Sequence, residues 1–543
     1  MPMLKLATRT EYHTLLDAAA LKQADDSAAI IYVETDQPDI VITRAAFRRE
    51  VRRYAAALKH LGVKPRDLII VAHVQNLESI YLFWGAMLVG AIPSMFPTLT
   101  EKLDPQIYMR NMGELVRLSG VRAVLTTDEF APTLGAAVDC PVYGSDHLRG
   151  LIPAEDVASF EQHTPAADEI AFLQHSSGTT GLQKGVALSH QAVLNQIASY
   201  SDALALRADD VVVSWLPLYH DMGLIAGFLM PLIQGVPLVL MSPFDWVRRP
   251  ALLFRAIHAH KGTLCWLPNF AYNHCARRVR SRDIEGLSLA SMRAFINCSE
   301  PVRHDSHQLF LERFAPLGVR EDMLAVSYAM AENTFAVTQT PPNQSARRDI
   351  VDGLALDEAR HAAPVAPDHP HARVMVSCGV SIPHTEVRVA AEDGAFLEER
   401  HVGELVIRSD CMLSGYYKRP DLDPFRDGWY FTGDMGYMAD GEVYVIGRKK
   451  DLIINAGKNV YPQDIEAIIN TVDGVHPGRA VVFGVPDERE GTELIAAVAE
   501  VDTDDPAARK QISQAIRQAV ASQTTVTLSY VHLVGDKWLI KTS

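Results

Sequence analysis

The chain has 543 residues, of which 48% are hydrophobic and 22% charged, and its formal net charge is -15 at pH 7. This length exceeds what one hydrophobic core usually supports, so we expect at least two domains. The acidic balance disfavours non-specific binding to nucleic acid or to an anionic membrane, so any basic site has to be local. The six cysteines lie far apart, which favours a reducing, cytoplasmic setting over a disulfide framework.

The first 160 residues alternate between β-branched runs and helical patterns. The pattern predicts strands at 30–33 and 68–71 and helices at 45–61 and 77–89. Such alternation is typical of a parallel sheet covered by helices, so we interpret this part as scaffold.

A glycine-rich segment at 176–185 reads Ser-Ser-Gly-Thr-Thr-Gly-Leu-Gln-Lys-Gly. Its glycines let the backbone approach a ligand closely, and its hydroxyls and Lys184 offer donors to the anionic oxygens of a polyphosphate. It differs from the common phosphate loop, because Gly185 stands where Ser or Thr would ligate magnesium. A flexible Ser/Gly loop is the alternative interpretation.

Short apolar runs at 170–173 and 186–188 flank this segment and predict strands, with Ser189 capping a helix that begins near Gln191. Farther on, residues 223–241 are long and apolar enough to span a bilayer. Proline and glycine interrupt that stretch, which favours a buried helix ending near Gln234 and a strand at 236–241. We therefore expect no integral membrane association.

Three polar residues stand in settings that suit ligand binding. His220 precedes Asp221 on a predicted turn, where adjacent side chains point apart, so His220 is expected to face a carboxylate or to be structural rather than to form a general-base pair. Glu332 lies between apolar runs, where a carboxylate is costly unless it meets a cation such as nucleotide-bound Mg²⁺; helix capping is the alternative. Asp434 follows Thr-Gly and suits the two hydroxyls of a ribose, or an Asx-turn.

Three other stretches leave alternatives open. The aromatics of 266–273 suit either an acyl channel or core packing. Residues 338–373 are rich in Pro, Ala, Asp and His and predict an inserted excursion or long loop. The cations at 448–450 cannot all face one ligand, and a solvated basic turn is the alternative. Beyond them, separate strand and helix patterns predict a small second domain hinged at 448–451.

The order of the glycine-rich segment, His220-Asp221, Glu332, Asp434 and Arg448 resembles the adenylate-forming superfamily over roughly residues 30–543. Within it the chain is most similar to the fatty acyl-AMP ligases, on the segments 215–225, 300–303 and 376–379 and on the position of the 338–373 excursion. The resemblance implies an α/β fold. Its large N-terminal domain, 1–447, would hold two α/β subdomains and a distorted β-barrel, and a small mobile α+β domain would follow at 448–543.

The resemblance also implies roles for individual residues. Lys184 would hold the β- and γ-phosphates, Glu332 would hold Mg²⁺, Asp434 would bind the ribose hydroxyls, and Arg448 would support the ribose or phosphate. His220 would lie near the acyl carboxylate, and Lys450 would be the pivot of the small domain. The remaining nucleotide-binding set is Ser176, Ser177, Gly178, Thr179, Thr180, Gly181, Ser299, Glu300, Tyr328 and Ala329, with Tyr328 stacking near adenine.

Two positions depart from the family pattern. Ala329 stands where relatives usually carry glycine. The family's adenylation lysine lies in a Ser-Gly-Lys just beyond a Lys-Thr-Ser run, whereas the sequence ends at Lys541-Thr542-Ser543, so Lys541 is not given that role. We expect this chain to bind ATP and to adenylate slowly.

The resemblance implies an enzyme that converts a fatty acid and Mg-ATP to acyl-adenylate and pyrophosphate, then delivers the acyl group to the phosphopantetheine thiol of an acyl carrier protein. A fatty acyl-CoA ligase is the first alternative, since only the excursion favours the carrier protein. A protein that binds a nucleotide or acyl-adenylate with little turnover is the second.

Overall fold

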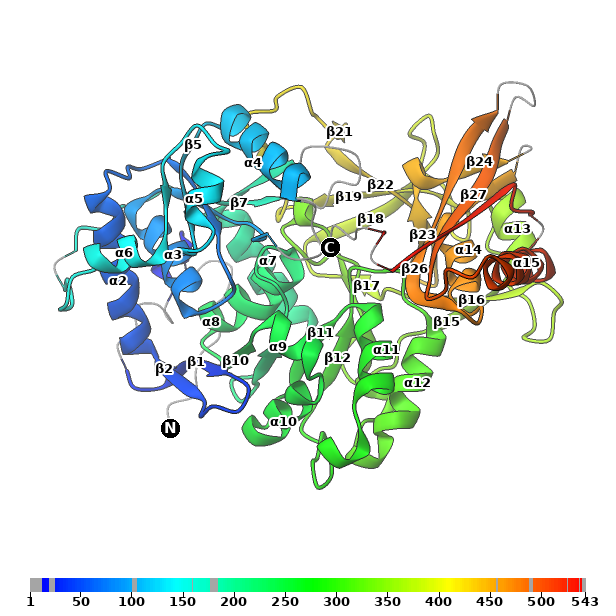
Figure 1. The fold of residues 1–543 in the computed structure, drawn as a ribbon, viewed down its shortest axis with the longest axis horizontal. Coiled ribbons are helices and arrows are strands. Elements are labelled where there is room, and N and C mark those ends of the chain that lie inside the picture. Colours follow the sequence, from blue (N-terminus) through cyan, green and yellow to red (C-terminus); the bar gives the residue numbers. More distant parts are fainter. Residues whose placement is uncertain are drawn as a thin grey trace.

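The computed structural model describes residues 12–18, 25–99, 105–158, 160–175, 184–455, 458–487, 492–524, 526–536 and 538–539. Two largely parallel sheets, an antiparallel sheet and a C-terminal sheet succeed one another along the chain. In Figure 1 the N-terminal elements, blue to cyan, lie at one end of the molecule and the C-terminal elements, orange to red, lie at the other. This arrangement confirms the expected α/β fold.

A seven-stranded sheet forms the centre, in the order β13-β12-β11-β9-β10-β1-β2. Its pairs are parallel except β1–β2. The apolar strand β10 is fully buried, as expected of a strand that is covered on both faces. The strands are β1 (Ala28–Val33), β2 (Ile40–Thr43), β9 (Val212–Ser214), β10 (Leu238–Met241), β11 (Leu264–Leu267), β12 (Ala294–Asn297) and β13 (Leu324–Val326). Their connecting helices include α9 (Pro243–Arg248), α10 (Ala251–His260), α11 (Asn269–Arg278) and α12 (His304–Phe314).

A parallel four-stranded sheet, in the order β4-β3-β5-β6, forms the N-terminal part. The predicted helices at 45–61 and 77–89 are confirmed as α2 (Arg44–His60) and α3 (Leu77–Val89). The predicted strands at 30–33 and 68–71 are confirmed too, but β1 belongs to the seven-stranded sheet. The other elements are β3 (Leu68–Ala72), β4 (Ile92–Met95), β5 (Val121–Thr126), β6 (Val142–Tyr143), α4 (Pro105–Ser119), α5 (Ala131–Gly135) and α6 (Ser145–Leu151).

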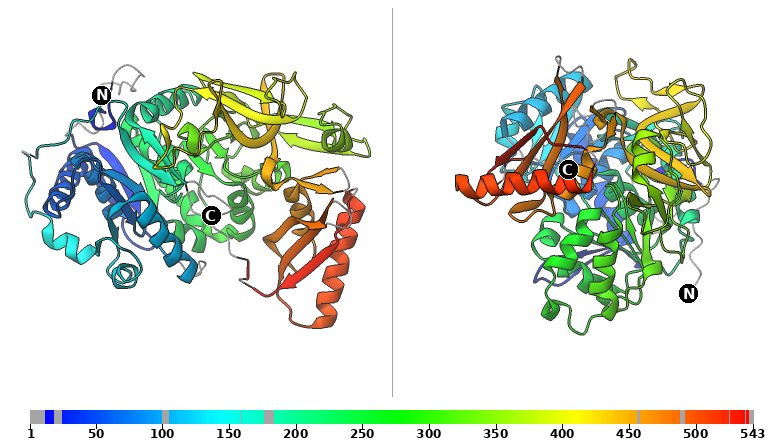
Figure 2. Two further views of the ribbon diagram at one scale, coloured as in Figure 1. Left: turned by 90° about the horizontal axis from the view of Figure 1, so that it is seen from above. Right: turned by 90° about the vertical axis from the view of Figure 1, so that its right-hand side faces the viewer.

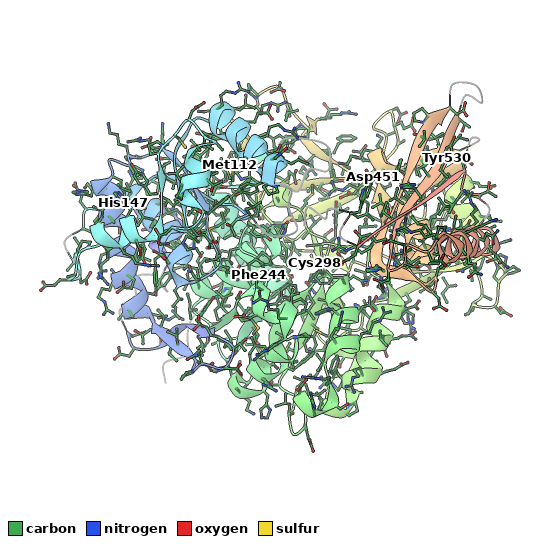
Figure 3. The ribbon with its side chains drawn as sticks, in the orientation of Figure 1. Met112, His147, Phe244, Cys298, Asp451 and Tyr530 are labelled. Carbon is green, nitrogen blue, oxygen red and sulfur yellow. The ribbon has the colours of Figure 1, made fainter. Side chains whose placement is uncertain are left out.

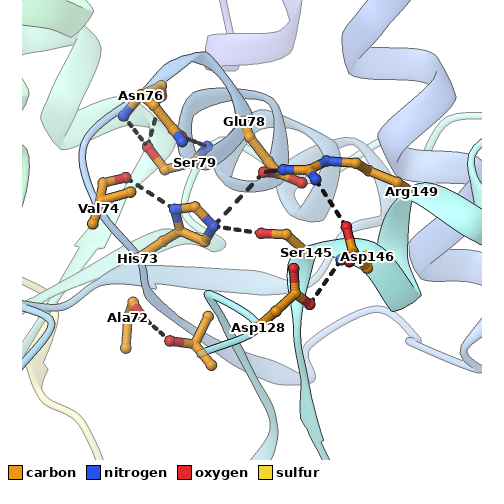
Figure 4. Close-up of polar contacts among 11 residues, drawn as sticks. Ala72, His73, Val74, Asn76, Glu78, Ser79, Asp128, Ser145, Asp146 and Arg149 are labelled. Carbon is orange, nitrogen blue, oxygen red and sulfur yellow. Dashed lines mark hydrogen bonds and ion pairs between the residues drawn. The ribbon is translucent and has the colours of Figure 1, made fainter. Parts of the chain in front are cut away.

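A buried polar clamp closes the carboxyl edge of this sheet (Figure 4). His73 follows β3, and its Nε2 lies 2.8 Å from Ser145 Oγ and 3.7 Å from Glu78 Oε2. Arg149 on α6 donates to the same Glu78 oxygen at 2.9 Å. These contacts join α3 and α6 to the end of β3, so they hold this sheet in place without facing the other motifs.

The strands around the glycine-rich segment are confirmed as β7 (Ile170–His175) and β8 (Gly185–Ser189). Ser189 caps α7 (His190–Ala203) by accepting a hydrogen bond from the amide of Ala192. The apolar stretch 223–241 forms a π-helical segment (Met222–Leu229), α8 (Met230–Gln234) and β10, as the breakers predicted. Across the part of the chain that is described, no helix combines the length and apolarity needed to cross a membrane.

An antiparallel five-stranded sheet follows at the position expected for the barrel. It comprises β18 (Thr385–Ala390), β19 (Gly403–Ser409), β21 (Phe425–Arg426), β22 (Trp429–Ala439) and β23 (Glu442–Arg448). The short β20 (Gly415–Tyr416) leaves this region and pairs with β8. Through β20, the antiparallel part touches the strand that follows the glycine-rich segment.

The excursion at 338–373 is more regular than a long loop, so that part of the prediction is corrected. It holds β14 (Thr338–Gln339), β15 (Arg348–Asp352) and α13 (Gly353–Glu358), and it runs into β16 (Ala372–Val376). β14 pairs with β17 (Val380–Ser381), and β15 pairs with β16 over five residues. Val351 and Leu356 from this excursion are fully buried against the antiparallel sheet, which explains its order.

Residues 453–534 form a unit with its own hydrophobic cluster. Its strands are β24 (Ile453–Asn455), β25 (Lys458–Val460), β26 (Val475–Asp487), β27 (Thr492–Val501) and β28 (Tyr530–Val534), and its helices are α14 (Pro462–Ile469) and α15 (Pro506–Gln523). Figure 2 shows these elements standing apart from the larger body, with α15 along the sheet of β26, β27 and β28.

Candidate active site

The glycine-rich segment meets the antiparallel part at Lys184. Residues 176–183, which include the predicted ligand-binding residues Ser176 to Gly181, lie outside the described residues. Lys184 Nζ lies 4.9 Å from the centre of the Tyr416 ring, a cation–π distance. The pairing of Tyr416 with Val186 explains this contact, because it brings β20 beside the first residues of β8.

Glu332 stands at the tip of a tight hairpin. Val337 N donates to Tyr328 O at 2.8 Å, and an isolated β-bridge joins Ala329 to Ala336, so residues 328–337 fold back on themselves. At the tip, Thr334 has φ of 63°, a strained value for a β-branched residue. The turn therefore presents Glu332 in a fixed position, and the helix-capping alternative is not needed to explain it.

Two tyrosines connect Glu332 to the antiparallel sheet. Tyr416 Oη donates to Glu332 Oε1 at 3.0 Å and lies 3.0 Å from Tyr430 Oη on β22. The amide of Leu413 donates to the Glu332 carbonyl at 2.8 Å. Glu332 and Lys184 are thus both in contact with Tyr416, although 148 residues separate them in the sequence.

Asp434 lies four residues farther along β22 than Tyr430. Its Oδ2 accepts a hydrogen bond from Tyr328 Oη at 2.5 Å, and its Oδ1 lies 3.2 Å from Arg448 Nε across the β22–β23 pair. Burial raises the pKa of Asp434 while the Arg448 charge opposes that rise. Burial and the Asp434 charge raise the pKa of Tyr328 well above its usual value, so its hydroxyl keeps its proton and donates.

The cations at 448–450 are all exposed, as in a solvated turn, but two of them have acidic partners. Arg448 faces Asp434, and Lys449 Nζ donates to Glu404 Oε2 at 2.9 Å. Asp451, labelled in Figure 3, ends the short turn that leads into the C-terminal unit. As expected, only part of this basic run faces the site.

His220 lies in the turn before the π-helical segment. Burial lowers the pKa of His220 to about 4, so its imidazole is neutral near pH 7. Burial raises the pKa of neighbouring Asp221 to about 6, and the charge of Glu332 adds to that rise. No hydrogen bond or ion pair between these two described side chains is seen, which agrees with the expectation that they point apart.

Ser299 and Glu300 follow β12, next to Cys298, which is labelled near the middle of Figure 3. Ser299 adopts a left-handed φ of 72°, and its Oγ lies 3.8 Å from the sulfur of Met222. Glu300 Oε2 accepts a hydrogen bond from Phe270 N at 2.8 Å, at the start of α11. Ser299 therefore lies beside the π-helical segment that follows His220, and Glu300 helps to cap a helix.

The aromatic stretch 266–273 is divided between core and surface. Trp266 and Tyr272 are fully buried, and Trp266 Nε1 donates to Tyr200 Oη at 2.8 Å. Phe270 is 44% exposed and borders the stacked pair of Trp215 and Trp246. Core packing explains most of this stretch, and only Phe270 retains the character of a channel residue.

The sequence singled out Lys184, Tyr328, Glu332, Asp434 and Arg448 separately. Side-chain contacts gather them into two groups, Lys184 and Glu332 on Tyr416, and Tyr328 and Arg448 on Asp434. Sequence reasoning missed the connector Tyr416, whose only sequence signal is a Gly-Tyr-Tyr run at 415–417. The assembled groups, a lysine, an arginine, two carboxylates and phenolic hydroxyls, can together receive an anion, a cation and a diol.

Comparisons with known proteins agree with this arrangement. The model of the AMP-binding enzyme family matches residues 16–417. A medium-chain-fatty-acid–[acyl-carrier-protein] ligase of Moorena producens is 28% identical and covers 99% of this chain and 94% of its own length. A Caulobacter vibrioides protein, provisionally named an acyl-CoA synthetase, is 29% identical and covers 96% of this chain and 92% of its own length.

The solved structures include one from a study of fatty acyl-adenylate ligases of E. coli and L. pneumophila. It is 26% identical, superposes with a TM-score of 0.88, and covers 99% of this chain and 96% of its own. Both the sequence and the fold thus point to the same family. The chain belongs to the AMP-binding enzyme family and is an ATP-dependent adenylating ligase.

Proposed function

We propose that the protein joins a fatty acid to AMP and transfers the acyl group to the phosphopantetheine thiol of an acyl carrier protein. The observation that carries the first step is a pair of contact groups joined by the 328–337 hairpin: Lys184 and Glu332 meet on Tyr416, and Tyr328 and Arg448 meet on Asp434. Lys184 would then bind the triphosphate, Glu332 the metal ion and Asp434 the sugar.

The nucleotide would be held at both ends. Asp434 would accept hydrogen bonds from the ribose hydroxyls, because each carboxylate oxygen has a second lone pair beside those used by Tyr328 and Arg448. Lys184 and the hydroxyls of the glycine-rich segment would take the β- and γ-phosphates. Ser299, Glu300 and Ala329 would border the base.

Glu332 fits a magnesium ion that arrives with the nucleotide. Mg²⁺ in nucleotide sites is commonly bound through one or two carboxylates, with phosphates and waters completing the shell, and Glu332 offers one carboxylate on a fixed turn. When bound, the ion would neutralise phosphate charge. Tyr416 would hold Glu332 in position for it.

The reaction requires two anions to meet. A carboxylate oxygen of the acid would attack the α-phosphorus, and the bond from that phosphorus to the bridging oxygen would break, releasing pyrophosphate. Lys184 and Arg448 would offset the charge repulsion between the reactants. His220, being neutral, would donate one N–H to the acid without changing the charge balance.

We place the domain boundary between 447 and 448, with residues 1–447 as the adenylation domain and 448–543 as the smaller domain. In support, the C-terminal unit has a separate hydrophobic cluster. The chain passes between the two parts at the turn Lys449–Asp451, so Lys450 remains the proposed pivot.

The excursion supports the carrier protein as acceptor. Arg373, at its end, makes a bidentate pair with Asp357 and lies 3.6 Å from Asp464 in the C-terminal unit. Arg303 adds a 2.8 Å hydrogen bond to the carbonyl of Gln463. These contacts would hold the small domain in its present orientation, which disfavours a rotation that CoA ligation would need.

The acceptor test follows from these contacts. Deleting 338–373 would remove the buried Val351 and Leu356, so we prefer the double variant Arg373→Ala/Asp464→Ala. If the contact between Arg373 and Asp464 restricts rotation of the small domain, the double variant should form more CoA thioester relative to loaded carrier protein. Mass spectrometry of the products measures this ratio. An unchanged ratio would remove this argument for the carrier protein and leave the acyl-CoA ligase, which the Caulobacter relative supports, as an equal alternative.

The first step is tested at Asp434. Asp434→Ala removes the acceptor of two proposed hydrogen bonds to a charged group, each worth about 1.5–3 kcal/mol, so ATP binding should weaken by about 100-fold or more in isothermal titration calorimetry. Asp440→Ala, in the exposed turn after β22, is the matched control. Undiminished ATP binding by Asp434→Ala would refute the proposed ribose contact.

Turnover is tested separately from binding. Wild-type protein that binds ATP yet releases no pyrophosphate with fatty acids of graded chain length would favour the binding-protein alternative. Acyl-adenylate in the product mixture would support the ligase.

A further inference from the structure

Three strand ends meet at one edge of the C-terminal sheet. β26 runs antiparallel to β27 with Val475 opposite Val501, and β27 runs parallel to β28 with Glu500 opposite Val534. The start of β26 and the ends of β27 and β28 therefore lie side by side. Figure 3 labels Tyr530, the first residue of β28, and this edge of the sheet lies at the opposite end of that strand.

Three potential metal ligands gather there. His476 on β26, Glu500 on β27 and Asp536, two residues beyond β28, each offer one ligand atom, and these atoms lie within 4.8 Å of one another. None of the three takes part in the proposed nucleotide site. The set combines one imidazole with two carboxylates.

Glu500 is the unusual member, because a carboxylate that is 0% exposed needs compensation. Its Oε1 accepts a hydrogen bond from Leu539 N at 2.6 Å. Its Oε2 accepts no hydrogen bond from the described residues, and the nearest cation, Arg479 Nε, is 3.6 Å away. This buried oxygen is therefore available to bind a cation that approaches more closely than Arg479 does.

His476 is oriented for ligation. Its Nε2 lies 2.6 Å from Asp502 Oδ1, so Nε2 carries the proton and donates, and the lone pair is on Nδ1. Nδ1 lies 3.8 Å from Asp536 Oδ1. A carboxylate that fixes the far nitrogen of an imidazole is the usual companion of a metal-bound histidine.

We propose that His476 Nδ1, Glu500 Oε2 and Asp536 bind a divalent transition-metal ion of the Zn²⁺ class. A mixed nitrogen and oxygen set favours such an ion over Mg²⁺ or Ca²⁺, which prefer oxygen alone. Metal–ligand bonds of about 2.0–2.2 Å require the ligand atoms to be roughly 3.5 Å apart, so atoms that lie within 4.8 Å of one another here would have to approach by up to about 1.3 Å. Asp536 can supply that movement, because its side chain is 58% exposed.

The local charge agrees with this assignment. Glu500, Asp502 and Asp536 carry three negative charges against one positive charge on Arg479, which leaves -2 among these described groups when His476 is neutral. A divalent cation would neutralise that excess. It would also tie the segment after β28 to the two strands beside it, independently of nucleotide.

The test uses untagged full-length protein titrated with ZnCl₂ by isothermal calorimetry without nucleotide. His476→Ala and Asp536→Asn should each bind one zinc equivalent fewer than wild type. Asp502→Asn should keep that equivalent with an affinity about 10–100-fold weaker. His260→Ala is the matched control, since His260 forms a comparable pair with Asp39 at 2.8 Å and, among the residues that the structure describes, has no third potential ligand beside it.

Asp536 is exposed, so its variant is expected to remain folded, and this keeps the result interpretable. Circular dichroism of Asp536→Asn should match wild type, and the visible absorption of Co²⁺ bound to wild type should be lost in the variant. Equal zinc stoichiometry and affinity in wild type, His476→Ala and Asp536→Asn would overturn the proposal. So would loss of the same equivalent in His260→Ala.

Discussion

Tyr416 is the residue on which the candidate site converges, because its ring contacts Lys184 and its hydroxyl contacts Glu332. Tyr416→Phe keeps the ring beneath the ammonium group and removes only the hydroxyl. Loss of one hydrogen bond to a carboxylate, worth about 1.5–3 kcal/mol, should lower kcat/KM for ATP about 10–100-fold in a pyrophosphate-release assay.

Tyr430→Phe is the matched comparison, since it removes the neighbouring hydroxyl and leaves the Tyr416–Glu332 bond in place. We expect Tyr430→Phe to lower kcat/KM for ATP less than Tyr416→Phe does. Equal rates for wild type and Tyr416→Phe would show that Glu332 needs no orienting partner.

Single residues were predictable where their local setting was unusual. Glu332 could be singled out because a carboxylate between apolar runs needs a partner, and Asp434 because it follows a Thr-Gly turn. The structure places Tyr416 beside Glu332 and Arg448 beside Asp434. Tyr416 itself could not be, because its importance comes from contacts with residues 84 and 232 positions away in the sequence. β20 pairs with β8 only when distant parts of the chain come together, and no local sequence pattern predicts that pairing.

At the scale of elements, α7 carries a pH-sensitive contact at its first turn. His190 is 3% exposed, its Nδ1 accepts a hydrogen bond from Leu15 N at 3.2 Å, and burial lowers its pKa to about 4. The folded state therefore binds this proton less readily than the unfolded chain. Stability from this group is complete above pH 6.5 and is lost as the pH falls toward 4.

His190→Asn keeps an acceptor for Leu15 N and does not titrate. Between pH 7 and pH 4, the free energy of unfolding of the variant should improve relative to wild type by at most about 3 kcal/mol, which corresponds to the lowered pKa. Urea denaturation followed by tryptophan fluorescence at several pH values measures this difference. Parallel pH profiles would contradict it.

Elements with strong periodicity were predicted closely, as α3 at 77–89 and the Ser189 cap of α7 show. Of the two alternatives for 338–373, an inserted excursion or a long loop, the long loop is wrong, because the prolines and histidines of this stretch obscure two short strands. Burial of Val351 and Leu356 against the antiparallel sheet provides the order that local propensity lacks.

On the scale of the whole molecule, the C-terminal unit has a core of its own. Ile516 on α15 is fully buried in that cluster. Ile516→Ala should destabilise this unit by about 2–5 kcal/mol and leave the larger body intact. Differential scanning calorimetry should then show an earlier transition for the small unit and an unchanged main transition.

The control is Lys510→Ala on the same helix. Arg517→Ala is less suitable, because Arg517 donates hydrogen bonds to two backbone carbonyls. A single transition that moves as one in Ile516→Ala would mean that the two parts unfold together. A small second domain was predicted from separate strand and helix patterns in the last hundred residues, whereas the contacts that Arg303 and Arg373 make with residues 463 and 464 have no signature in the sequence.

The Asp434–Arg448 pair occupies the last rung of the β22–β23 ladder, directly before the chain crosses to the C-terminal unit. A ligand that forms hydrogen bonds with Asp434 must therefore compete with the ion pair between Asp434 and Arg448. If the smaller unit turns about 448–451, ligand binding at Asp434 and the orientation of that unit are thermodynamically coupled, and each changes the equilibrium of the other by the same factor.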